Sequence, residues 1–404
     1  MRVAAVIAEY DPFHRGHAYL VQAARKAGAT HVAAILSGQF LQRGAAACFS
    51  KWTRARQALS CGVDLVVELP LPWAMAGAQT FARGGVALAA ALGADVLAFG
   101  SECGDATALE TVAEALLQKP MNTAVRTYLR GGISYAKARE QAVADALGEK
   151  VAALLRTPNN ILGIAYCEAI RLLDAPLKTL TVRRIGAAHD STAPDALPSA
   201  TRIRAQLCTN GNWQAGLPRP SAAVAVKALA AGMAPAMLSR VERAVLYRLR
   251  TMTREELAAL PDVREGLENR LYAAARKADS LETLYASVKT KRYSHARIRR
   301  VTLSAFLGLR AGMAEATPPY LRVLGFADAG REILARAKQK AILPLVTRAS
   351  DRFRLDSRGQ SVFELENTAT DIWALCLPTP APAGLDLTTG VLALSHRGGE
   401  SIGN

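Results

Sequence analysis

The sequence predicts an α/β protein in which a Rossmann-like domain with a parallel sheet is followed by a mainly helical, basic domain. The first observation is a set of short apolar runs without in-and-out alternation, separated by stretches with helical spacing. Strands of that kind, each followed by a helix, are typical of a parallel sheet covered on both faces. The second observation is the scarcity of β-branched clusters after residue 221. The expected strands are 3–8, 32–36, 64–68 and 95–99, and the expected helices are 17–27, 51–61 and 79–92.

The remaining elements of the first domain follow in order. The chain becomes mostly helical and ends this stretch in PNNILGIAYCEAIRLLD, where Asn159 or Asn160 can cap a helix. A β-like run at 177–183 then leads through a loop to SATRIRAQL, a short helix with Ser199 as its N-cap. We therefore expect the first domain to occupy residues 1–215.

The later part of the chain is expected to hold a helical domain over 216–345, with a linker at 218–223 (PRPSAA). Apolar residues recur there at i, i+3 and i+4, which indicates helices with one buried face. Residues 346–404 form a C-terminal segment with one helix around 365–376. Its Pro-, Gly- and Thr-rich tail is expected to be mobile at its end.

Composition and charge narrow the class of protein. Half of the 404 residues are hydrophobic and 21% are charged, which excludes a disordered chain. The net charge is +16; residues 1–150 hold 15 basic and 12 acidic side chains, leaving 35 and 22 for the rest. The basic part at 151–404, with a net charge of +13, suggests a polyanionic partner. Nucleic acid is favoured over an anionic membrane surface. The alternative is a general arginine bias of the proteome.

Cysteine spacing and the N-terminus indicate the compartment. The six cysteines form no CxxC pair, so neither a zinc module nor a disulfide framework is expected. The apolar run at 3–8 is too short for a signal-peptide core, and no uncharged run reaches about 18 residues. We expect a soluble cytoplasmic protein with no membrane partner and, among oligomeric states, favour a monomer.

The most informative segment is IAEYDPFHRGHAYL, which leaves the first expected strand, turns at Asp11-Pro12 and opens a helix. It places His14 and His17 around Gly16, so both imidazoles can donate hydrogen bonds to an anion at the helix N-terminus. Gly16 leaves room for a ligand against the backbone. This pattern suits nucleotidyl transfer, in which the imidazoles stabilise charge on the α-phosphate and the leaving pyrophosphate.

Two other interpretations of this segment stay open. The two histidines can merely cap a helix and pack a turn. They can also bind a metal, although no third ligand lies at a suitable spacing.

DPFHRGH resembles the HxGH signature of the nucleotidyltransferase superfamily, which includes class I aminoacyl-tRNA synthetases and coenzyme adenylyltransferases. Further segments narrow the resemblance to the bacterial tRNA(Met) cytidine acetate ligase family, over about residues 1–330 in order. These segments are SGQFLQRG (37–44), KWTRARQAL (51–59), GVDLVVELP (62–70), FGSECGD (99–105), PNNILGIAY (158–166), RRIGAAHD (183–190), SATRIR (199–204), KRYSHARIRR (291–300) and VLGF (323–326). Ala188 departs from the family pattern, because an aromatic residue usually stands there.

The resemblance implies a ligase that joins acetate to AMP from ATP and passes the acetyl group to N4 of the wobble cytidine, position 34, of elongator tRNA(Met). ATP, accompanied by Mg²⁺, is then a substrate, and no metal is held by the protein. His14 and His17 are the expected catalytic residues. The expected ATP-binding residues are Ile7, Ala8, Glu9, Tyr10, Asp11, Pro12, Phe13, His14, Arg15, Gly16, His17, Ala18, Tyr19, Leu20, Gly100, Asn160, Arg184, Ile185, Ser199, Thr201 and Arg204.

Several of these residues also have a purely structural interpretation. Gly100 ends the fourth strand, where it can admit the adenosine or simply form a turn. Asn160 can bind the nucleotide or cap its own helix, and the two roles are compatible. Ser199, Thr201 and Arg204 can bind phosphate at a helix start, or belong to a surface helix.

The run KTKRYSHARIRR at 289–300 is basic, contains no acidic residue and includes an aromatic ring. Basic side chains contact phosphates and aromatic rings stack on unpaired bases, as in proteins that bind single-stranded RNA loops. The alternative is a solvated helix face. The expected tRNA-binding residues of this run are Lys291, Arg292, Tyr293, Arg297, Arg299 and Arg300. A second expected group lies beside the nucleotide site and consists of Arg43, Lys51 and Arg54. These three side chains can equally steer the polyphosphate of ATP.

Two rival functions remain at this point. A small-molecule adenylyltransferase that makes a coenzyme precursor would explain HxGH but leave the basic later part without a role. A tRNA-binding protein with a vestigial nucleotide site conflicts with the intact His14, Gly16 and His17.

Overall fold

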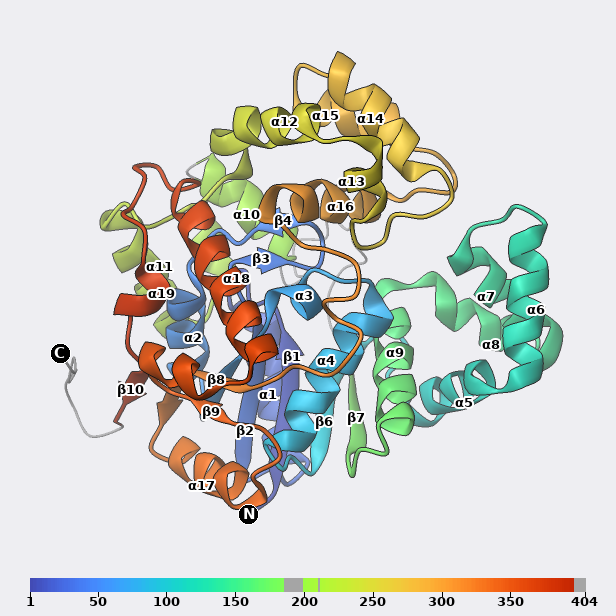
Figure 1. The fold of residues 1–404 in the computed structure, drawn as a ribbon. Coiled ribbons are helices and arrows are strands. Elements are labelled where there is room, and N and C mark those ends of the chain that lie inside the picture. The colour runs from blue at the N-terminus through green and yellow to red at the C-terminus, as the bar shows by residue number, and fades with distance from the viewer. Residues whose placement is uncertain (185–198, 210, 396–404) are drawn as a thin grey trace.

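The computed structural model describes residues 1–184, 199–209 and 211–395. Its centre is a sheet with strand order β10-β8-β5-β2-β1-β6-β7, in which β9 also pairs with β8 (Figure 1). The pairs β2-β5, β1-β2, β1-β6 and β6-β7 are parallel, whereas β5 and β8 are antiparallel. The strands of the sheet are β1 (Val3–Ala8), β2 (His31–Ser37), β5 (Leu65–Leu69), β6 (Val96–Ser101), β7 (Lys178–Arg183), β8 (Leu321–Ala327), β9 (Leu345–Val346) and β10 (Leu392–Leu394); a separate hairpin consists of β3 (Phe40–Leu41) and β4 (Ala45–Ala46).

Both faces of the sheet are covered, as the absence of alternation predicts. In β1, Val3 and Ile7 pack into one core with α4 and α9, while Ala4 and Val6 pack into another with α1 and α2. The helices of this part are α1 (Arg15–Lys26), α2 (Lys51–Leu59), α3 (Leu71–Ala74), α4 (Ala78–Ala91), α5 (Ala106–Leu117), α6 (Lys119–Arg130), α7 (Tyr135–Leu147), α8 (Glu149–Ala152), α9 (Pro158–Leu172) and α10 (Ala200–Cys208). The Rossmann-like prediction is confirmed.

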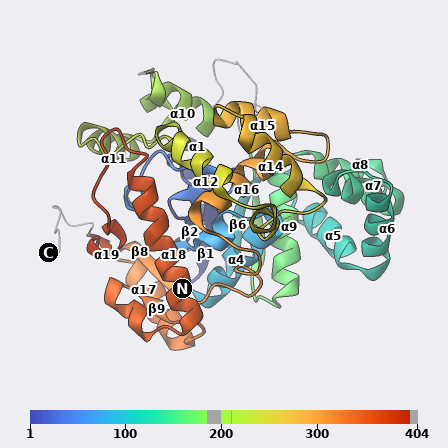
Figure 2. The same cartoon turned by 45° about the horizontal axis from the view of Figure 1, so that its top comes forward.

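Five of the later helices form a core of their own above the carboxyl edge of the sheet. Leu249, Leu271, Leu284 and Val301 are among its fully buried members. The helices that build this core are α12 (Glu242–Thr251), α13 (Arg254–Ala258), α14 (Leu267–Lys277), α15 (Leu281–Val288) and α16 (His295–Leu307). The other later helices are α11 (Arg219–Ala230), which packs with α10 through Ala225, α17 (Gly330–Lys340), which packs into the sheet core through Ile333, and α18 (Ser357–Ala374) and α19 (Leu385–Thr388). In Figures 1 and 2, α5–α8 project as a separate lobe to the right of the sheet.

The structure corrects three sequence-based expectations about the later part. PRPSAA at 218–223 is not a linker, because Pro220 lies in the first turn of α11, where a missing N–H costs no hydrogen bond. The range 216–345 is not helical throughout, because β8 returns to the sheet and pairs with β5. The segment after 345 also contributes β10, so the sheet extends beyond residues 1–215. A strand pairing between distant segments leaves no local spacing signal.

Helix α18 joins the sheet core to the helical core. Phe363 is fully buried in the sheet core, and Trp373 is fully buried in the helical core. The Trp373 indole Nε1 donates to the Ala47 carbonyl at 2.7 Å, which fixes the end of the helix to the β3–β4 hairpin. The C-terminal segment is therefore an integral part of both cores up to residue 395, and the tail expected to be mobile lies at 396–404, outside the described residues.

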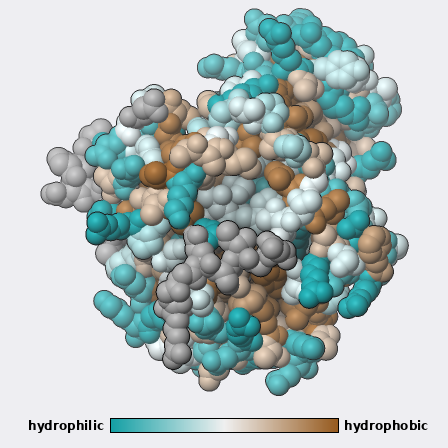
Figure 3. Space-filling view, turned by 90° about the vertical axis from the view of Figure 1, so that its left-hand side faces the viewer, coloured by the Kyte–Doolittle hydropathy of each residue, from teal (hydrophilic) through white to brown (hydrophobic). Residues whose placement is uncertain are grey.

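The surface seen from the left of Figure 1 carries hydrophilic side chains with smaller hydrophobic areas between them (Figure 3). None of the helices in the described ranges is both long and apolar enough to cross a membrane.

Candidate active site

The two histidines of HxGH lie where β1 ends and α1 begins, at the carboxyl edge of the sheet. His14 is the N-cap of α1, and its Nδ1 accepts a hydrogen bond from the Gly16 N–H at 3.0 Å. The His14 N–H in turn donates to Nδ1 of His17 at 3.2 Å. A Cβ on Gly16 would lie 2.9 Å from the His14 ring, so glycine at this position lets the ring fold over the helix end.

This geometry fixes the tautomers of both rings. The rings of His14 and His17 stack with centroids 3.7 Å apart and planes 20° apart. Each Nδ1 accepts a backbone N–H, so the ring proton must sit on Nε2. Burial, with nearby Arg184 and Arg204, lowers the pKa of His14 from 6.5 to about 4. Burial and His14 lower the pKa of His17 well below 6.5, so both rings are neutral donors near pH 7.

Aromatic packing holds the pair in place. Tyr10 and Phe13 are buried, and their ring centroids lie 4.7 and 5.5 Å from that of His17. The Ser221 hydroxyl at the start of α11 donates to the Phe13 carbonyl at 2.7 Å. Tyr10 and Phe13 were both predicted to bind ATP. In the structure they are buried and position His17 through packing.

The rest of the 7–20 segment divides between the interior and the surface. Ile7, Asp11 and Pro12 are buried, and Ala8, Glu9, Gly16, Ala18 and Leu20 are partly buried. Arg15 and Tyr19 point to solvent from the first turns of α1. The N–H groups of Gly16 and His17 are already bonded to His14, so the helix N-terminus contributes mainly the positive end of its dipole beside the two imidazoles.

An ion network supports the loop that precedes HxGH. The Arg43 guanidinium donates to a Glu9 oxygen at 2.8 Å and to Asp11 Oδ2 at 2.5 Å. Arg204 donates to the Asp11 carbonyl at 2.9 Å and to the Thr201 hydroxyl at 3.1 Å. Burial and the charge of Arg43 lower the pKa of Arg204. The structure therefore brings the SATRIR helix to the HxGH loop, as predicted.

Ser199 has the expected capping role, because its hydroxyl accepts from the Arg202 N–H at 3.3 Å at the start of α10. This contact supports the structural interpretation of Ser199.

Residues from β6 and α9 form the neighbouring wall. The Asn160 side-chain oxygen accepts from the Glu102 and Cys103 N–H groups at 3.0 and 3.1 Å. The Glu102 carboxylate accepts from the Asn159 and Asn160 N–H groups at 3.1 and 2.7 Å. The predicted capping by Asn159 or Asn160 is wrong, because Thr157 is the N-cap and Glu102 satisfies the helix end. Glu102, the acidic residue directly after a strand in FGSECGD, is the sequence feature that could have indicated this cap.

Gly100 and Arg184 also lie on this wall. A Cβ on Gly100 would lie 3.4 Å from Cγ of Arg184, so a side chain there would crowd the arginine. The Arg184 guanidinium donates to Asn159 Oδ1 at 3.1 Å. Ile185 and Ala188 lie outside the described residues.

The structure contradicts the expected tRNA contacts of Lys51 and Arg54. Both side chains are fully buried. The Lys51 ammonium lies 2.7 Å from Glu68, and Arg54 donates to the Glu9 and Ser37 carbonyls at 2.6 and 3.0 Å. Arg54 thus ties the loops after β1 and β2 together. The positions of Lys51 and Arg54 on α2 could not predict this burial, because their partners come from other segments of the chain.

Three residues of the basic run lie on the surface. Lys291, Arg292 and Arg299 are exposed. Tyr293 is 4% exposed and its hydroxyl donates to the Glu265 carbonyl at 2.5 Å, so its predicted stacking on a base is wrong.

The two other arginines of the run have protein partners. Arg297 donates to the Asp262 carbonyl at 2.9 Å, and Arg300 pairs with the Asp262 carboxylate at 3.1 Å. Both are half-buried by these contacts.

The β3–β4 hairpin connects the basic run to the nucleotide loop. The Gln42 N–H donates to the Glu9 carboxylate at 2.8 Å, and the Gln42 carbonyl accepts from Arg300 at 3.3 Å. A Cβ on Gly44 would lie 2.6 Å from the Arg300 backbone nitrogen. Gln42 thus contacts both the loop before HxGH and α16, and Gly44 packs directly against α16.

No three His, Cys, Asp or Glu side chains in the described part of the chain gather as a metal site. The arrangement offers neutral N–H donors, guanidinium groups and a helix N-terminus, which is suited to binding and polarising a polyphosphate.

Comparisons with known proteins identify the family of the chain. The family described as HIGH Nucleotidyl Transferase matches residues 1–385. Proteins named tRNA(Met) cytidine acetate ligase are similar over nearly the whole chain. The protein of Alkaliphilus metalliredigens is 35% identical, and the match covers 94% of this chain and 96% of that protein. The protein of Syntrophotalea carbinolica is 38% identical, and the match covers 94% of this chain and 95% of that protein. The crystal structures of Thermotoga maritima TmcAL, apo and bound with alpha-thio ATP, are 29% identical, cover 98% of this chain and all of theirs, and give TM-scores of 0.93 and 0.92. The chain therefore belongs to the tRNA(Met) cytidine acetate ligase family of HIGH nucleotidyl transferases.

Proposed function

We propose that this protein activates acetate with ATP and acetylates N4 of the cytidine at position 34 of elongator tRNA(Met), giving N4-acetylcytidine. The observation that carries the proposal is the stacked His14–His17 pair, whose Nε2–H groups lie beside the N-terminus of α1. The names of relatives that match 94% of the chain support the choice of acetate and tRNA.

In the first step, an acetate oxygen attacks the α-phosphorus of ATP and the bond to the β-phosphate oxygen breaks. Acetyl-adenylate and pyrophosphate form. His14 and His17 donate Nε2–H hydrogen bonds to the oxygens on which charge grows, and Arg204 adds positive charge beside the same loop. Mg²⁺ accompanies ATP as its phosphate-bound counterion.

In the second step, N4 of the cytidine attacks the acetyl carbonyl. A C–N bond forms, the bond from the carbonyl carbon to the phosphate oxygen breaks, AMP leaves and N4 loses a proton. The exocyclic amine is a poor nucleophile because its lone pair is delocalised into the ring. A mixed anhydride is therefore a suitable donor.

We assign the two steps to different parts of the chain. Residues 1–215 bind ATP, and residues 216–345 present exposed Lys291, Arg292 and Arg299 to tRNA in the cytoplasm. The β3–β4 hairpin, through Gln42, links the two parts.

ATP–pyrophosphate exchange with acetate tests the first step, and mass spectrometry of nucleosides from tRNA(Met) tests the second. We expect exchange that requires acetate and N4-acetylcytidine at position 34. Exchange that needs no carboxylate would instead favour the small-molecule adenylyltransferase. Propionate and longer carboxylates in the same assay give the selectivity.

A further inference from the structure

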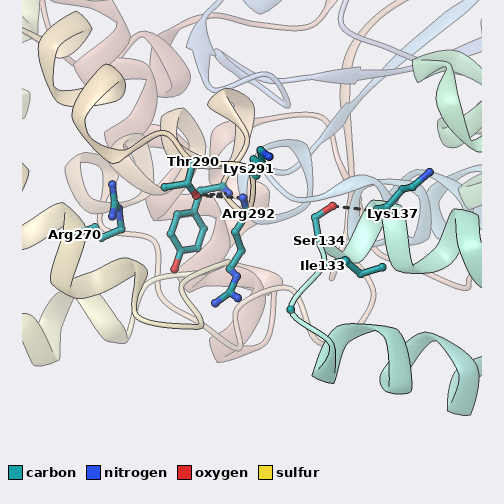
Figure 4. A pocket seen from close by; sticks show the side chains of 9 residues that line it. Ile133, Ser134, Lys137, Arg270, Thr290, Lys291 and Arg292 are labelled. Atoms are coloured by element: carbon teal, nitrogen blue, oxygen red, sulfur yellow. Dashed lines mark hydrogen bonds between the residues drawn. The ribbon is translucent and has the colours of Figure 1, made fainter.

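A cavity of about 580 Å³ lies between the α5–α8 lobe and the helical part of the chain. One wall is the start of α7, with Ser134 as its N-cap and Lys137 in its first turn. The other wall holds Arg270 of α14 and the loop with Lys291 and Arg292. Figure 4 shows these labelled residues coming from two separate groups of helices, with Arg292 between them. We call this space the basic cavity.

The lining of the basic cavity is strongly cationic. Four of its nine lining residues carry positive charge, and no lining residue is acidic. The Lys137 ammonium contacts Glu140 at 2.9 Å on its own helix, and one N–H of Arg270 donates to the Ser287 carbonyl at 3.1 Å. Each of these contacts leaves other N–H groups of the same side chain available. The cavity is therefore suited to an anion with several charged oxygens.

Local backbone structure adds to this preference. Ser134 is the N-cap of α7, a helix of 13 residues, so the positive end of the helix dipole adds to the cations of the cavity. A Cβ on Gly132 would lie 3.8 Å from Nη2 of Arg292, which places the guanidinium close to the turn on the opposite wall. The two walls thus contribute to one electropositive space.

The composition of the lining favours a nucleic-acid backbone over a small apolar ligand. Sites for small molecules are mostly lined by apolar and aromatic side chains. Here Ile133 is the aliphatic lining residue, and the Tyr293 hydroxyl is already bonded to Glu265. The cavity also shares Lys291 and Arg292 with the exposed basic run, so an RNA strand on that run can continue into it.

We propose that the basic cavity holds backbone phosphates of the tRNA, and that Lys137 and Arg270 are tRNA contacts. This inference rests on the proposed acetylation of tRNA. It adds the α5–α8 lobe to the RNA-binding surface, so that the tRNA is held from two sides.

The test is the double variant Lys137→Ala, Arg270→Ala. Its dissociation constant for tRNA(Met) is measured over a range of salt concentrations by fluorescence anisotropy. We expect weaker binding and a log–log salt slope smaller by about 1.4 to 1.8, since each lost phosphate contact removes roughly 0.7 to 0.9. Thermal unfolding checks that the variant is folded.

The matched control is Lys26→Ala, Lys338→Ala, which removes the same charge from exposed positions on α1 and α17. We expect its tRNA affinity and salt slope to stay close to those of the wild type. Equal weakening by both double variants would mean a general charge effect and would overturn the proposal. So would wild-type affinity and slope in the Lys137→Ala, Arg270→Ala variant.

A pyrophosphate titration separates RNA phosphates from a free polyphosphate ion. Binding of pyrophosphate that the double variant loses, with unchanged tRNA affinity, would assign the cavity to the free ion and overturn the proposal. The proposed function fails on a different result, namely wild-type protein that forms no N4-acetylcytidine. If the wild type acetylates tRNA and the double variant binds it normally, only the role of the basic cavity is lost.

Discussion

The Lys51 ammonium lies 2.7 Å from Oδ1 of Asp386, an ion pair between α2 and the start of α19. Both side chains are fully buried, and Glu68 and Arg322 complete the group. Lys51 and Arg322 hold the pKa of Asp386 below its usual value although burial opposes this. The C-terminal segment is therefore fixed to the sheet by buried charge as well as by packing.

Removing one member of this group is expected to destabilise the protein strongly. Asp386→Ala removes the carboxylate that pairs with both buried cations and leaves them with Glu68 and the buried Glu366 nearby, and breaking a buried ion pair typically costs about 3–5 kcal/mol. Chemical and thermal unfolding measure the loss. Glu315→Gln, an exposed carboxylate elsewhere, is the control. A loss below about 1 kcal/mol for Asp386→Ala would show that the network contributes little.

The two histidines should be required for adenylation. His17→Ala is expected to reduce acetate-dependent ATP–pyrophosphate exchange by about 10²–10³, the usual effect of removing a charge-stabilising donor. His14→Ala is expected to be less severe. His14→Asn keeps an acceptor for the Gly16 N–H and a side-chain donor, so it should retain more activity than His14→Ala. Wild-type exchange by a variant lacking both histidines would contradict the assignment.

The depressed pKa of His14 predicts a pH effect on stability. The unfolded chain takes up a proton near the ordinary histidine pKa of 6.5, whereas the folded protein resists it until about pH 4. Between these values the unfolded state binds more protons, so stability falls as pH falls. The melting temperature of the wild type should therefore drop between pH 6.5 and 4 by more than that of His14→Asn. Parallel curves for the two proteins would contradict a neutral, partly buried His14.

Exposed members of the basic run should act on tRNA. The triple variant Lys291→Ala, Arg292→Ala, Arg299→Ala is expected to weaken tRNA(Met) binding and to reduce the log–log salt slope by about 2 to 3. Exchange with acetate reports on the ATP site in the same preparation. If the triple variant acetylates tRNA at the wild-type rate, the run is only a solvated face.

Gly44 should be required at the contact between the hairpin and α16. Its φ is +74°, and a Cβ there would lie 2.6 Å from both Cβ of Arg299 and the backbone nitrogen of Arg300. Gly44→Ala must therefore shift the hairpin and disturb Gln42, which contacts Glu9. We expect a lower melting temperature and a larger loss of tRNA acetylation than of exchange.

Gly308→Ala is the matched control for this prediction. Its φ is +77°, close to that of Gly44, but no atom lies within 4 Å of the added Cβ. It measures the backbone strain alone, which is about 1–2 kcal/mol. Equal effects of the two substitutions on stability and acetylation would show that contact with α16 is unimportant.

The local features of this protein were determined by the sequence. Apolar runs without alternation predicted β1, β2, β5 and β6, because strands buried on both faces need no polar side chains. HxGH predicted a histidine pair at a helix N-terminus, since the pair and its hydrogen bonds lie within four consecutive residues. The resemblance of ordered segments then pointed to the family.

Other features were decided only by the tertiary structure. Lys51 and Arg54 have the spacing of surface residues on α2, but partners such as Asp386 bury them. The strand β8 pairs with β5, which lies far from it in the sequence. Lys137 and Arg270, also far apart in the sequence, line the same cavity. Hydrophobic periodicity records which face of an element is buried, whereas the identity of the segment that covers it depends on packing between residues far apart in the chain.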